Sequence, residues 1–369
     1  MTSTDTIVIG AGAMGSATAW QLAKRGREVT LIEQFAPGHK NGASHGETRN
    51  FNVAYSEPEY IELLVESLRL WRELESDADT TLLDLRGLIG HGPGDHYATV
   101  FKKLTGTGIP AEMLTADEAA ERWGGIRFDS AVLFNREAGT VNANASVTAL
   151  QAVAARHGAE VLHNTRVVDI QVLGPNHVSV SLETGETLTA SRVVVTVGAW
   201  TEKLLGNRVA LPRLVVTQEQ PAHFAIRDES VDWPSFNHRP GVGEGYDYWY
   251  SPVYGMETVG EGIKAGWHGT GPVVDPDHRD FGSEPVQRAA LQRYARDWLP
   301  GVDSESLVDI SCTYTSTDST DFVLDAFGPI VVGAGFSGHG FKFTPAIGRI
   351  LADLATGVSR PAEIFRAAR

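Results

Sequence analysis

The chain has 369 residues, and its 46 Asp and Glu against 31 Lys and Arg give a formal net charge of −15. An acidic protein of this kind repels phosphate backbones, which excludes nucleic acid as a partner. A single cysteine rules out an internal disulfide and fits a reducing compartment. No apolar run approaches the roughly twenty residues that cross a bilayer. We therefore expect a cytoplasmic protein with no membrane segment and no leader.

A glycine-rich turn follows the first predicted strand. Residues 7–9 are a β-branched run, typical of a buried parallel strand, and a helix is predicted over 13–24. Between them lie Gly10, Gly12 and Gly15, spaced as G-x-G-x-x-G. Gly10 permits the tight turn, Gly12 lets a pyrophosphate approach the backbone, and Gly15 lets the helix pack against the strand. The helix N-terminus then faces the phosphates.

The second predicted strand, over 28–32, ends at Glu33. A carboxylate about twenty residues after such glycines can bind the hydroxyls of a ribose. An acid there disfavours a 2′-phosphate, so the unit is predicted to bind FAD or NAD rather than NADP. The alternative is a glycine-rich turn that binds no ligand.

Local signals predict further helices along the chain. These are an apolar stripe over 61–71, a capping box of Thr115 and Glu118, Asn144 as the N-cap of a helix reaching 158, and Pro285 at the start of a helix over 285–298.

The end of the chain repeats the strand, glycine loop and helix of its beginning, over about 328–357. This second unit needs a sheet, and the simplest place is beside the first. Alternating strands fill much of the middle. We therefore predict an α/β (mixed α+β) fold with a discontinuous Rossmann-like FAD-binding domain and an antiparallel-sheet substrate domain. Residues 1–80, 145–212 and 310–369 would form the first domain, and 81–144 and 213–309 the second. NAD dehydrogenases usually complete such a domain continuously, which favours FAD.

Five ordered blocks together resemble the monomeric sarcosine oxidase family: the N-terminal turn, "SHGETR", "IKAGWH", "SCTYTSTDSTDFVLD" and "GAGFSGHGFKFTPAIG". These are FAD enzymes that oxidise secondary amines of N-substituted amino acids. The resemblance spans nearly the whole chain. It implies a monomer that moves a hydride equivalent from the carbon beside nitrogen to the flavin, releases an imine that hydrolyses, and reduces O2 to hydrogen peroxide.

The resemblance implies roles for particular residues. Cys312 would be joined through sulfur to the flavin ring, and Arg49 would lie close to the flavin. Lys264 would activate oxygen, since a compact cation stabilises the negative charge that develops there. Lys342 would bind the substrate's carboxylate, and His268 would lie in the active site. No metal is expected.

The same resemblance implies the remaining cofactor contacts, with Val168 at the adenine end: Ala13, Met14, Gln34, Ser44, His45, Thr48, Val168, Gly198, Trp200, Gly335, Phe336, Gly338, His339 and Gly340. Plainer interpretations stay open. Cys312 would then be a buried thiol, Lys264 an edge residue, Lys342 a surface cation and His268 a core histidine. Arg49 would pair with Glu47 or Glu57.

One position departs from the family pattern. Sarcosine and N-methyltryptophan oxidases carry a second arginine three residues after Arg49, where this chain has Asn52. The segment before Lys264 is long and aromatic, with Tyr250 as a pocket residue and Trp267 after it. These features favour an N-fructosyl (Amadori) amino acid as the substrate. The alternatives are sarcosine or another N-methyl amino acid, and a flavin dehydrogenase that passes electrons to a protein.

Overall fold

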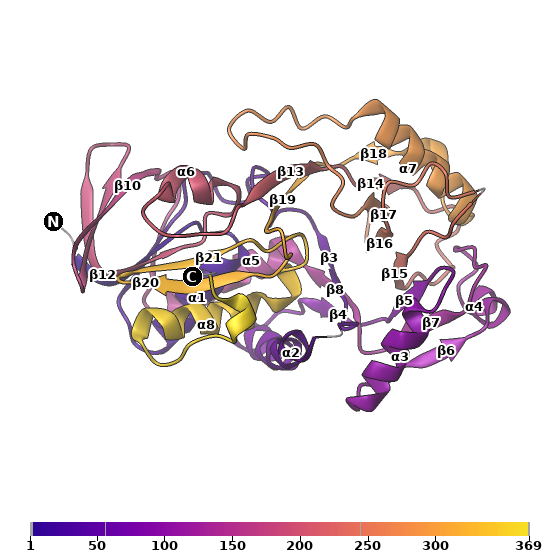
Figure 1. The fold of residues 1–369 in the computed structure, drawn as a ribbon, viewed down its shortest axis with the longest axis horizontal. Helices are drawn as coiled ribbons and strands as arrows, with labels where there is room; N and C mark the ends of the chain where they lie inside the picture. Colours follow the sequence, from indigo (N-terminus) through magenta and orange to yellow (C-terminus); the bar gives the residue numbers. More distant parts are fainter. Residues whose placement is uncertain (1–2, 56, 244, 368–369) are drawn as a thin grey trace.

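The computed structural model describes residues 3–55, 57–243 and 245–367. The molecule is elongated, with one sheet in each half and short connecting strands between them (Figure 1). Within the described ranges, no helix is both long enough and apolar enough to cross a membrane.

The first sheet has parallel strands in the order β9–β2–β1–β12–β21, and antiparallel strands are added by β11 and β10 beside β12 and by β20 beside β21. Its strands are β1 (Ser3–Ile9), β2 (Val29–Ile32), β9 (Glu160–Leu162), β10 (Val167–Gly174), β11 (His177–Leu182), β12 (Thr187–Val195), β20 (Val323–Phe327) and β21 (Ile330–Ala334). Strand β21 pairs in parallel with β12, so the end of the chain returns to the sheet that its beginning started. The predicted return is confirmed, whereas the exact domain boundaries stay a prediction.

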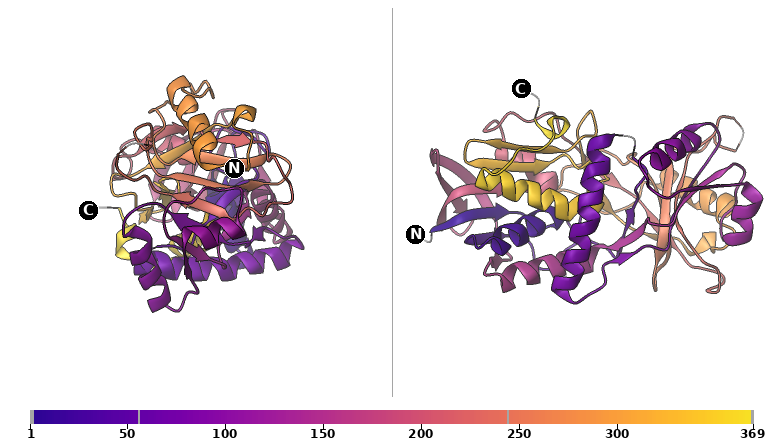
Figure 2. Two further views of the ribbon diagram at one scale, coloured as in Figure 1. Left: turned by 90° about the vertical axis from the view of Figure 1, so that its right-hand side faces the viewer. Right: turned by 90° about the horizontal axis from the view of Figure 1, so that it is seen from below.

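Helices α1 (Ala13–Lys24), α5 (Ala143–Arg156), α8 (Thr344–Thr356) and α2 (Pro58–Ala78) cover this sheet. Helix α1 lies between α8 and α5, as the right view of Figure 2 shows. The backbones of α1 and α8 nearly touch, because a Cβ added at Gly348 would lie 2.5 Å from the carbonyl carbon of Ala17. This tight packing fixes the N-terminus of α1.

The second sheet is antiparallel apart from the parallel pair β5 and β15. Its order is β18 (Val308–Asp309), β14 (Ala222–Phe224), β17 (Gly262–Trp267), β16 (Val253–Thr258), β15 (Ser235–His238), β5 (Leu88–His91), β7 (Val132–Asn135) and β6 (Glu112–Leu114). Helices α3 (His96–Gly106), α4 (Ala116–Arg122) and α7 (Pro285–Trp298) accompany it.

Short elements connect the two halves (Figure 1). Strands β3 (Thr48–Phe51), β8 (Gly139–Asn142) and β4 (Leu83–Asp84) form one small sheet, and β13 (Val215–Glu219) pairs with β19 (Cys312–Ser316). The remaining elements are α6 (Thr201–Leu205) and the 3₁₀ turns η1 (Gly198–Trp200), η2 (Ser304–Ser306), η3 (Phe341–Phe343) and η4 (Glu363–Phe365).

Most predicted helix signals are confirmed. Helix α1 has the predicted bounds, and the capping box of Thr115 and Glu118 starts α4 with both of its hydrogen bonds present. The N-cap predicted at Asn144 is wrong. Asn142 caps α5 by accepting from the Ala145 amide at 2.9 Å, because Asn144 Oδ1 instead accepts from the Gly46 amide at 3.0 Å.

Candidate active site

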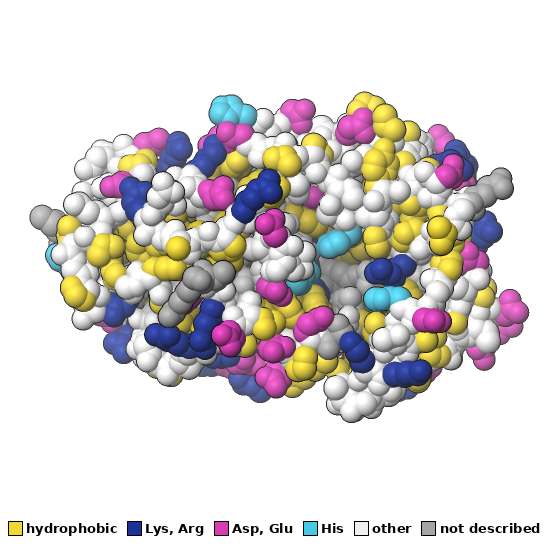
Figure 3. Space-filling model, viewed as in Figure 1, with side chains coloured by type: hydrophobic (Ala, Val, Ile, Leu, Met, Phe, Trp, Pro, Cys, Tyr) yellow, Lys and Arg dark blue, Asp and Glu magenta, His cyan; other side chains and the backbone are white. Residues whose placement is uncertain are grey.

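A central cavity of about 1990 Å³ extends from the glycine-rich turn to the inner ends of the second sheet. Figure 3 shows a hollow near the middle of the molecule, with histidine and basic side chains at its edge. Pockets for a single small ligand measure roughly 300–1,000 Å³. The central cavity therefore has room for a dinucleotide and a substrate together.

The glycine-rich turn has the geometry of a dinucleotide cradle. Gly10 has a φ of +94°, and a Cβ there would lie 2.6 Å from the Thr196 carbonyl oxygen. A Cβ at Gly15 would lie 1.9 Å from the Gly10 carbonyl oxygen, so Gly15 serves packing and does not line the cavity. The Ala13 amide at the N-terminus of α1 donates to Ser44 Oγ at 3.0 Å. An anion at this helix end would meet backbone donors and the positive end of the helix dipole.

Glu33 lies at the end of β2 on the wall of the central cavity. Its side chain is 7% exposed, and it accepts hydrogen bonds from the amides of Ala11 at 2.9 Å and Phe35 at 3.1 Å. These two bonds hold the carboxylate beside the cradle. Ribose hydroxyls can donate to its remaining lone pairs, so the site fits a dinucleotide.

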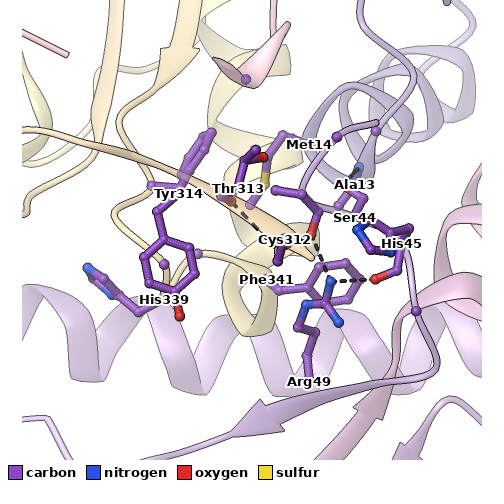
Figure 4. Close-up of a pocket in the computed structure, with 18 of the residues that line it drawn as sticks. Ala13, Met14, Ser44, His45, Arg49, Cys312, Thr313, Tyr314, His339 and Phe341 are labelled. Atoms are coloured by element: carbon purple, nitrogen blue, oxygen red, sulfur yellow. Dashed lines mark hydrogen bonds between the residues drawn. The ribbon is translucent and has the colours of Figure 1, made fainter. Parts of the chain in front are cut away.

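Cys312 begins β19 and lies opposite Glu219 of β13. Its thiol is free and partly exposed on the cavity wall, with Sγ 3.9 Å from the Ala43 carbonyl oxygen. Figure 4 shows Cys312 between Met14 on one side and Arg49 on the other. The thiol therefore faces the same space as the cradle.

The Arg49 side chain holds the loop that precedes β3 by binding backbone carbonyl groups of that loop. Its guanidinium donates to the carbonyl oxygens of Thr48 at 2.8 Å and Ala43 at 2.9 Å. It also donates to the His45 carbonyl oxygen at 2.5 Å, as Figure 4 shows. Glu47 instead accepts from the side-chain amides of Asn142 and Asn144. The pairing of Arg49 with Glu47 that stayed open from the sequence is therefore absent.

Two buried lysines face the cavity from opposite elements. Lys264 on β17 donates to the Thr48 carbonyl oxygen at 2.5 Å. Lys342 in η3 donates to Tyr55 Oη and to the His339 carbonyl oxygen, both at 2.9 Å. Burial lowers the pKa of each lysine to about 7, and the charge of Arg49 adds to the effect at Lys264. Because these partners are neutral oxygen atoms, an anionic ligand would stabilise either ammonium group.

Three histidines that line the cavity, His45, His268 and His339, have lowered pKa values. Burial lowers the pKa of His45 and of His339 to about 3, and it also lowers the pKa of His268. Positive charge beside these three histidines therefore comes from arginine and lysine side chains.

Two tyrosines that sequence reasoning missed line the cavity beside His268. Tyr314 Oη lies 3.4 Å from His268 Nδ1, and the Tyr254 ring lies edge-on to the His268 ring. The sequence pattern could have identified Tyr314. It follows Cys312 by two residues in a strand, and residues at that spacing share a face.

Most of the predicted site residues line the central cavity. They are Gly10, Gly12, Ala13, Met14, Glu33, Gln34, Ser44, His45, Thr48, Arg49, Asn52, Val168, Gly198, Trp200, Lys264, His268, Cys312, Gly335, Phe336, Gly338, His339, Gly340 and Lys342.

Tyr250 and Trp267 do not belong to this lining. Trp267 is 3% exposed and packs against the rings of Trp249 and Tyr294. Tyr250 is 42% exposed, and its ring centroid lies 6.0 Å from that of Trp267. Their placement corrects the expectation that both form the substrate pocket, because alternation along β17 turns the indole into the core.

Residues 5–354 match the FAD dependent oxidoreductase (DAO) family. The chain is 34% identical to the monomeric sarcosine oxidase of Bacillus sp. (strain B-0618), over 95% of this chain and 92% of that protein. The chain belongs to the monomeric sarcosine oxidase family. It is also 28% identical to the N-methyl-L-tryptophan oxidase of Salmonella arizonae, over 95% of this chain and 94% of that one.

Solved structures agree with this family. The open form of NikD, an amino acid oxidase essential for nikkomycin biosynthesis, has a TM-score of 0.89 at 26% identity and covers 100% of this chain and 99% of its own. Glycine oxidase from Geobacillus kaustophilus, at 21% identity, shares the fold with a TM-score of 0.81 and covers 100% of this chain and 99% of its own. The protein is therefore a FAD-dependent amine oxidase, and the NAD-dependent alternative is wrong.

Proposed function

We propose that the protein oxidises an N-methyl amino acid with FAD attached to Cys312 and O2 as the acceptor. Bound FAD would take a hydride equivalent from the carbon beside the substrate nitrogen. The observation that carries the proposal is the pair of desolvated lysines in one cavity with the cradle. One cation suits a substrate carboxylate and the other suits oxygen reduction, and the reaction needs both.

Lys342 is the proposed carboxylate ligand. Its Nζ is held by Tyr55 and His339, which fixes its direction without neutralising its charge. Asn52 also lines the cavity, and its Oδ1 accepts from the Ala54 amide at 2.9 Å. Its amide nitrogen is therefore turned to donate as a neutral group. Lys342 would supply the charge that an arginine at position 52 shares in other family members.

Lys264 is the proposed oxygen-activating residue. Its ammonium is fixed by the Thr48 carbonyl, one residue before Arg49. A positioned cation in a site shielded from water stabilises the anion that forms when oxygen gains an electron. Lys264 can hold or give a proton near neutral pH, since its pKa is about 7.

The N-methyl substrate is favoured over the fructosyl substrate that we preferred from the sequence. Relatives named as sarcosine oxidases and an N-methyl-L-tryptophan oxidase support it. The fructosyl interpretation rested partly on the aromatic segment, and Tyr250 and Trp267 of that segment lie outside the cavity lining. Tyr254 of the same segment does line the cavity, so the preference rests mainly on the named relatives.

A peroxide assay of the purified protein tests this function. The panel would be sarcosine, N-methyltryptophan, pipecolate, fructosyl-valine and fructosyl-lysine, without an added electron acceptor. We expect peroxide from at least one of the N-methyl amino acids and loss of that activity in Lys342→Met. Peroxide from the fructosyl compounds alone would overturn the proposal that the substrate is an N-methyl amino acid. Turnover only with an added acceptor would instead support the flavin dehydrogenase alternative.

A further inference from the structure

Four polar side chains form a continuous row of contacts beside the proposed oxygen site. Thr48 Oγ1 and Thr258 Oγ1 lie 2.7 Å apart, and Thr258 Oγ1 lies 3.2 Å from His223 Nε2. His223 Nε2 in turn lies 3.3 Å from Glu261 Oε2. We call these four residues the Thr48–Glu261 row. The reaction proposed above gives no role to His223, Thr258 or Glu261.

The strands of the second sheet hold this row against Lys264. His223 on β14 is the cross-strand partner of Lys264 on β17. Thr258 follows Met256 by two residues on β16, and Met256 is the other cross-strand partner of Lys264. Residues related in these ways share one face of a sheet. Thr48 joins the row to the lysine, because its carbonyl oxygen accepts from Lys264 Nζ at 2.5 Å while its hydroxyl contacts Thr258.

The row runs from a buried end to an exposed end. Thr258 is 1% exposed, and Lys264 is buried as well. Glu261 lies in the turn between β16 and β17, and its side chain is 49% exposed. Thr48, His223 and Glu261 line the central cavity. The row therefore connects a solvent-accessible carboxylate with the surroundings of a desolvated lysine.

The inner members of the row can each take up a proton on one side and give a proton on the other. A hydroxyl has one donor and two acceptor sites, so Thr258 can bind His223 and Thr48 at once. Burial and the charge of Lys264 lower the pKa of His223 to about 4. Its imidazole is therefore neutral near pH 7 and has one ring nitrogen that can accept a proton.

We propose that the Thr48–Glu261 row carries the second proton of oxygen reduction from solvent to the oxygen site. The proposal rests on the oxidase function proposed above. A hydride equivalent gives the flavin two electrons and one proton, whereas hydrogen peroxide forms from O2 with two electrons and two protons. The missing proton passes from Glu261 to His223 Nε2 and on to Thr258, whose own hydroxyl proton moves to Thr48. Thr48 gives its hydroxyl proton to the reduced oxygen beside Lys264, and Glu261 takes a new proton from water.

Reoxidation of the photoreduced holoenzyme tests the row without any substrate. The flavin is reduced anaerobically by light and EDTA and mixed with oxygenated buffer, and its absorbance is followed in H2O and in D2O. The variants are Thr258→Val, which removes the hydroxyl at similar size, and Thr258→Ser, which keeps it. Thr6→Val is the matched control, because Thr6 is also a buried strand threonine but lies outside the cavity lining.

We expect Thr258→Val to slow reoxidation at least about tenfold. Positioned proton transfer contributes about 10²–10⁴-fold to a rate, and water in the cavity replaces part of this effect. The solvent isotope effect should rise in the same variant, since proton delivery then limits the rate. Thr258→Ser and Thr6→Val should keep the wild-type values. An unchanged isotope effect in Thr258→Val, at any rate, would overturn the relay.

His223→Ala tests the next member of the row. His223 lines the cavity, so added imidazole can reach the space that its side chain leaves. We expect slow reoxidation that imidazole partly restores, and no effect of imidazole on the wild type. Reoxidation of His223→Ala at the wild-type rate without imidazole would contradict the route.

A measurement without turnover checks the contact between His223 and Thr258. In holoenzyme labelled with ¹⁵N-histidine, the His223 ring signals are identified by their loss in His223→Ala. They should shift in Thr258→Val and stay in place in Thr6→Val. Unmoved His223 signals in Thr258→Val would show that the contact is absent and would overturn the row.

Failure of the proposed function gives different results. Wild-type reduced flavin that oxygen reoxidises no faster than free flavin would overturn the oxidase function and the relay together. Fast reoxidation of the photoreduced enzyme without peroxide from any N-methyl amino acid would overturn the substrate alone. The rate and isotope effect of Thr258→Val would still decide the relay in that case.

Discussion

At the scale of single residues, the site depends on two buried lysines, Lys264 and Lys342. Because they are buried, the protonation of each depends on the groups that bind it. Both lysines have a pKa of about 7. Their hydrogen-bond partners are neutral oxygen atoms of three residues in the cavity wall. The nearby His45 and His339 are uncharged, since burial lowers the pKa of each to about 3. Small changes at these positions should therefore separate substrate binding from oxygen reduction.

Replacing Lys264 by Met should slow the reaction of reduced flavin with oxygen. Removing one positioned electrostatic group costs about 10²–10³-fold in rate, whereas flavin reduction by substrate should change far less. Stopped-flow measurement of the two half-reactions checks this. Equal slowing of both would show that Lys264 is not the oxygen site.

Carboxylate binding should weaken as pH rises through 7. The lowered pKa means that Lys342 is protonated below about pH 7 and neutral above it. Affinity for acetate, which has no amine of its own to titrate, should be greatest below pH 7 and fall by up to about tenfold per pH unit above it. Flavin absorbance during acetate titrations measures this affinity.

Both lysines have a pKa of about 7, so a variant of each is needed to show which one causes the pH dependence of acetate affinity. Lys264→Met should keep the fall in acetate affinity, and Lys342→Met should bind weakly with little dependence on pH. The assignment fails when Lys342→Met retains the wild-type profile.

An arginine at position 52 should improve the binding of a small N-methyl amino acid. A hydrogen bond to a charged group contributes about 1.5–3 kcal/mol, so we expect KM for sarcosine to fall about 10–100-fold in Asn52→Arg with little change in kcat. Asn52→Gln is the neutral control. An unchanged KM in Asn52→Arg would place the carboxylate away from this position.

At the scale of elements, the sequence predicts what local rules determine. Helices α1, α4 and α7 have their signals at their own ends, in Gly12, Thr115 and Pro285. The strand pair β13–β19 brings together residues about a hundred positions apart, and no local pattern announces such a pair. Tyr254 was missed for a different reason, because Tyr250, which precedes β16, was taken as the pocket tyrosine, whereas the hairpin of β16 and β17 places Tyr254 beside the active-site strand.

The contact between α1 and α8 should be intolerant of any side chain at Gly348. A Cβ there would lie 2.5 Å from both the carbonyl carbon and the Cβ of Ala17. Overpacking of this kind costs about 1–3 kcal/mol, so Gly348→Ala should lower Tm and the fraction of protein that incorporates FAD, because α1 carries the cradle. Gly106→Ala in α3 is the control, since nothing lies within 4 Å of its added Cβ. Equal Tm values for the two variants would contradict this account.

At the scale of the whole molecule, distant segments assemble one chamber. The cradle comes from the start of the chain, Lys264 from the second sheet, and Cys312 and Lys342 from the end. Local motifs predicted the dinucleotide cradle, and the resemblance to the sarcosine oxidase family implied the FAD chemistry and most of the lining. Alternation along β17 places Trp267 on the face opposite Lys264, whereas the direction of Tyr250, which lies outside the strands, depends on how the sheets pack.

The central claim is that flavin bound in this chamber oxidises an N-methyl amino acid. The most direct measurement is flavin absorbance of the purified enzyme after anaerobic addition of sarcosine or N-methyltryptophan. We predict that at least one of them bleaches the flavin band and that air restores it. Flavin that stays oxidised with both of them, while a fructosyl amino acid bleaches it, would contradict the claim.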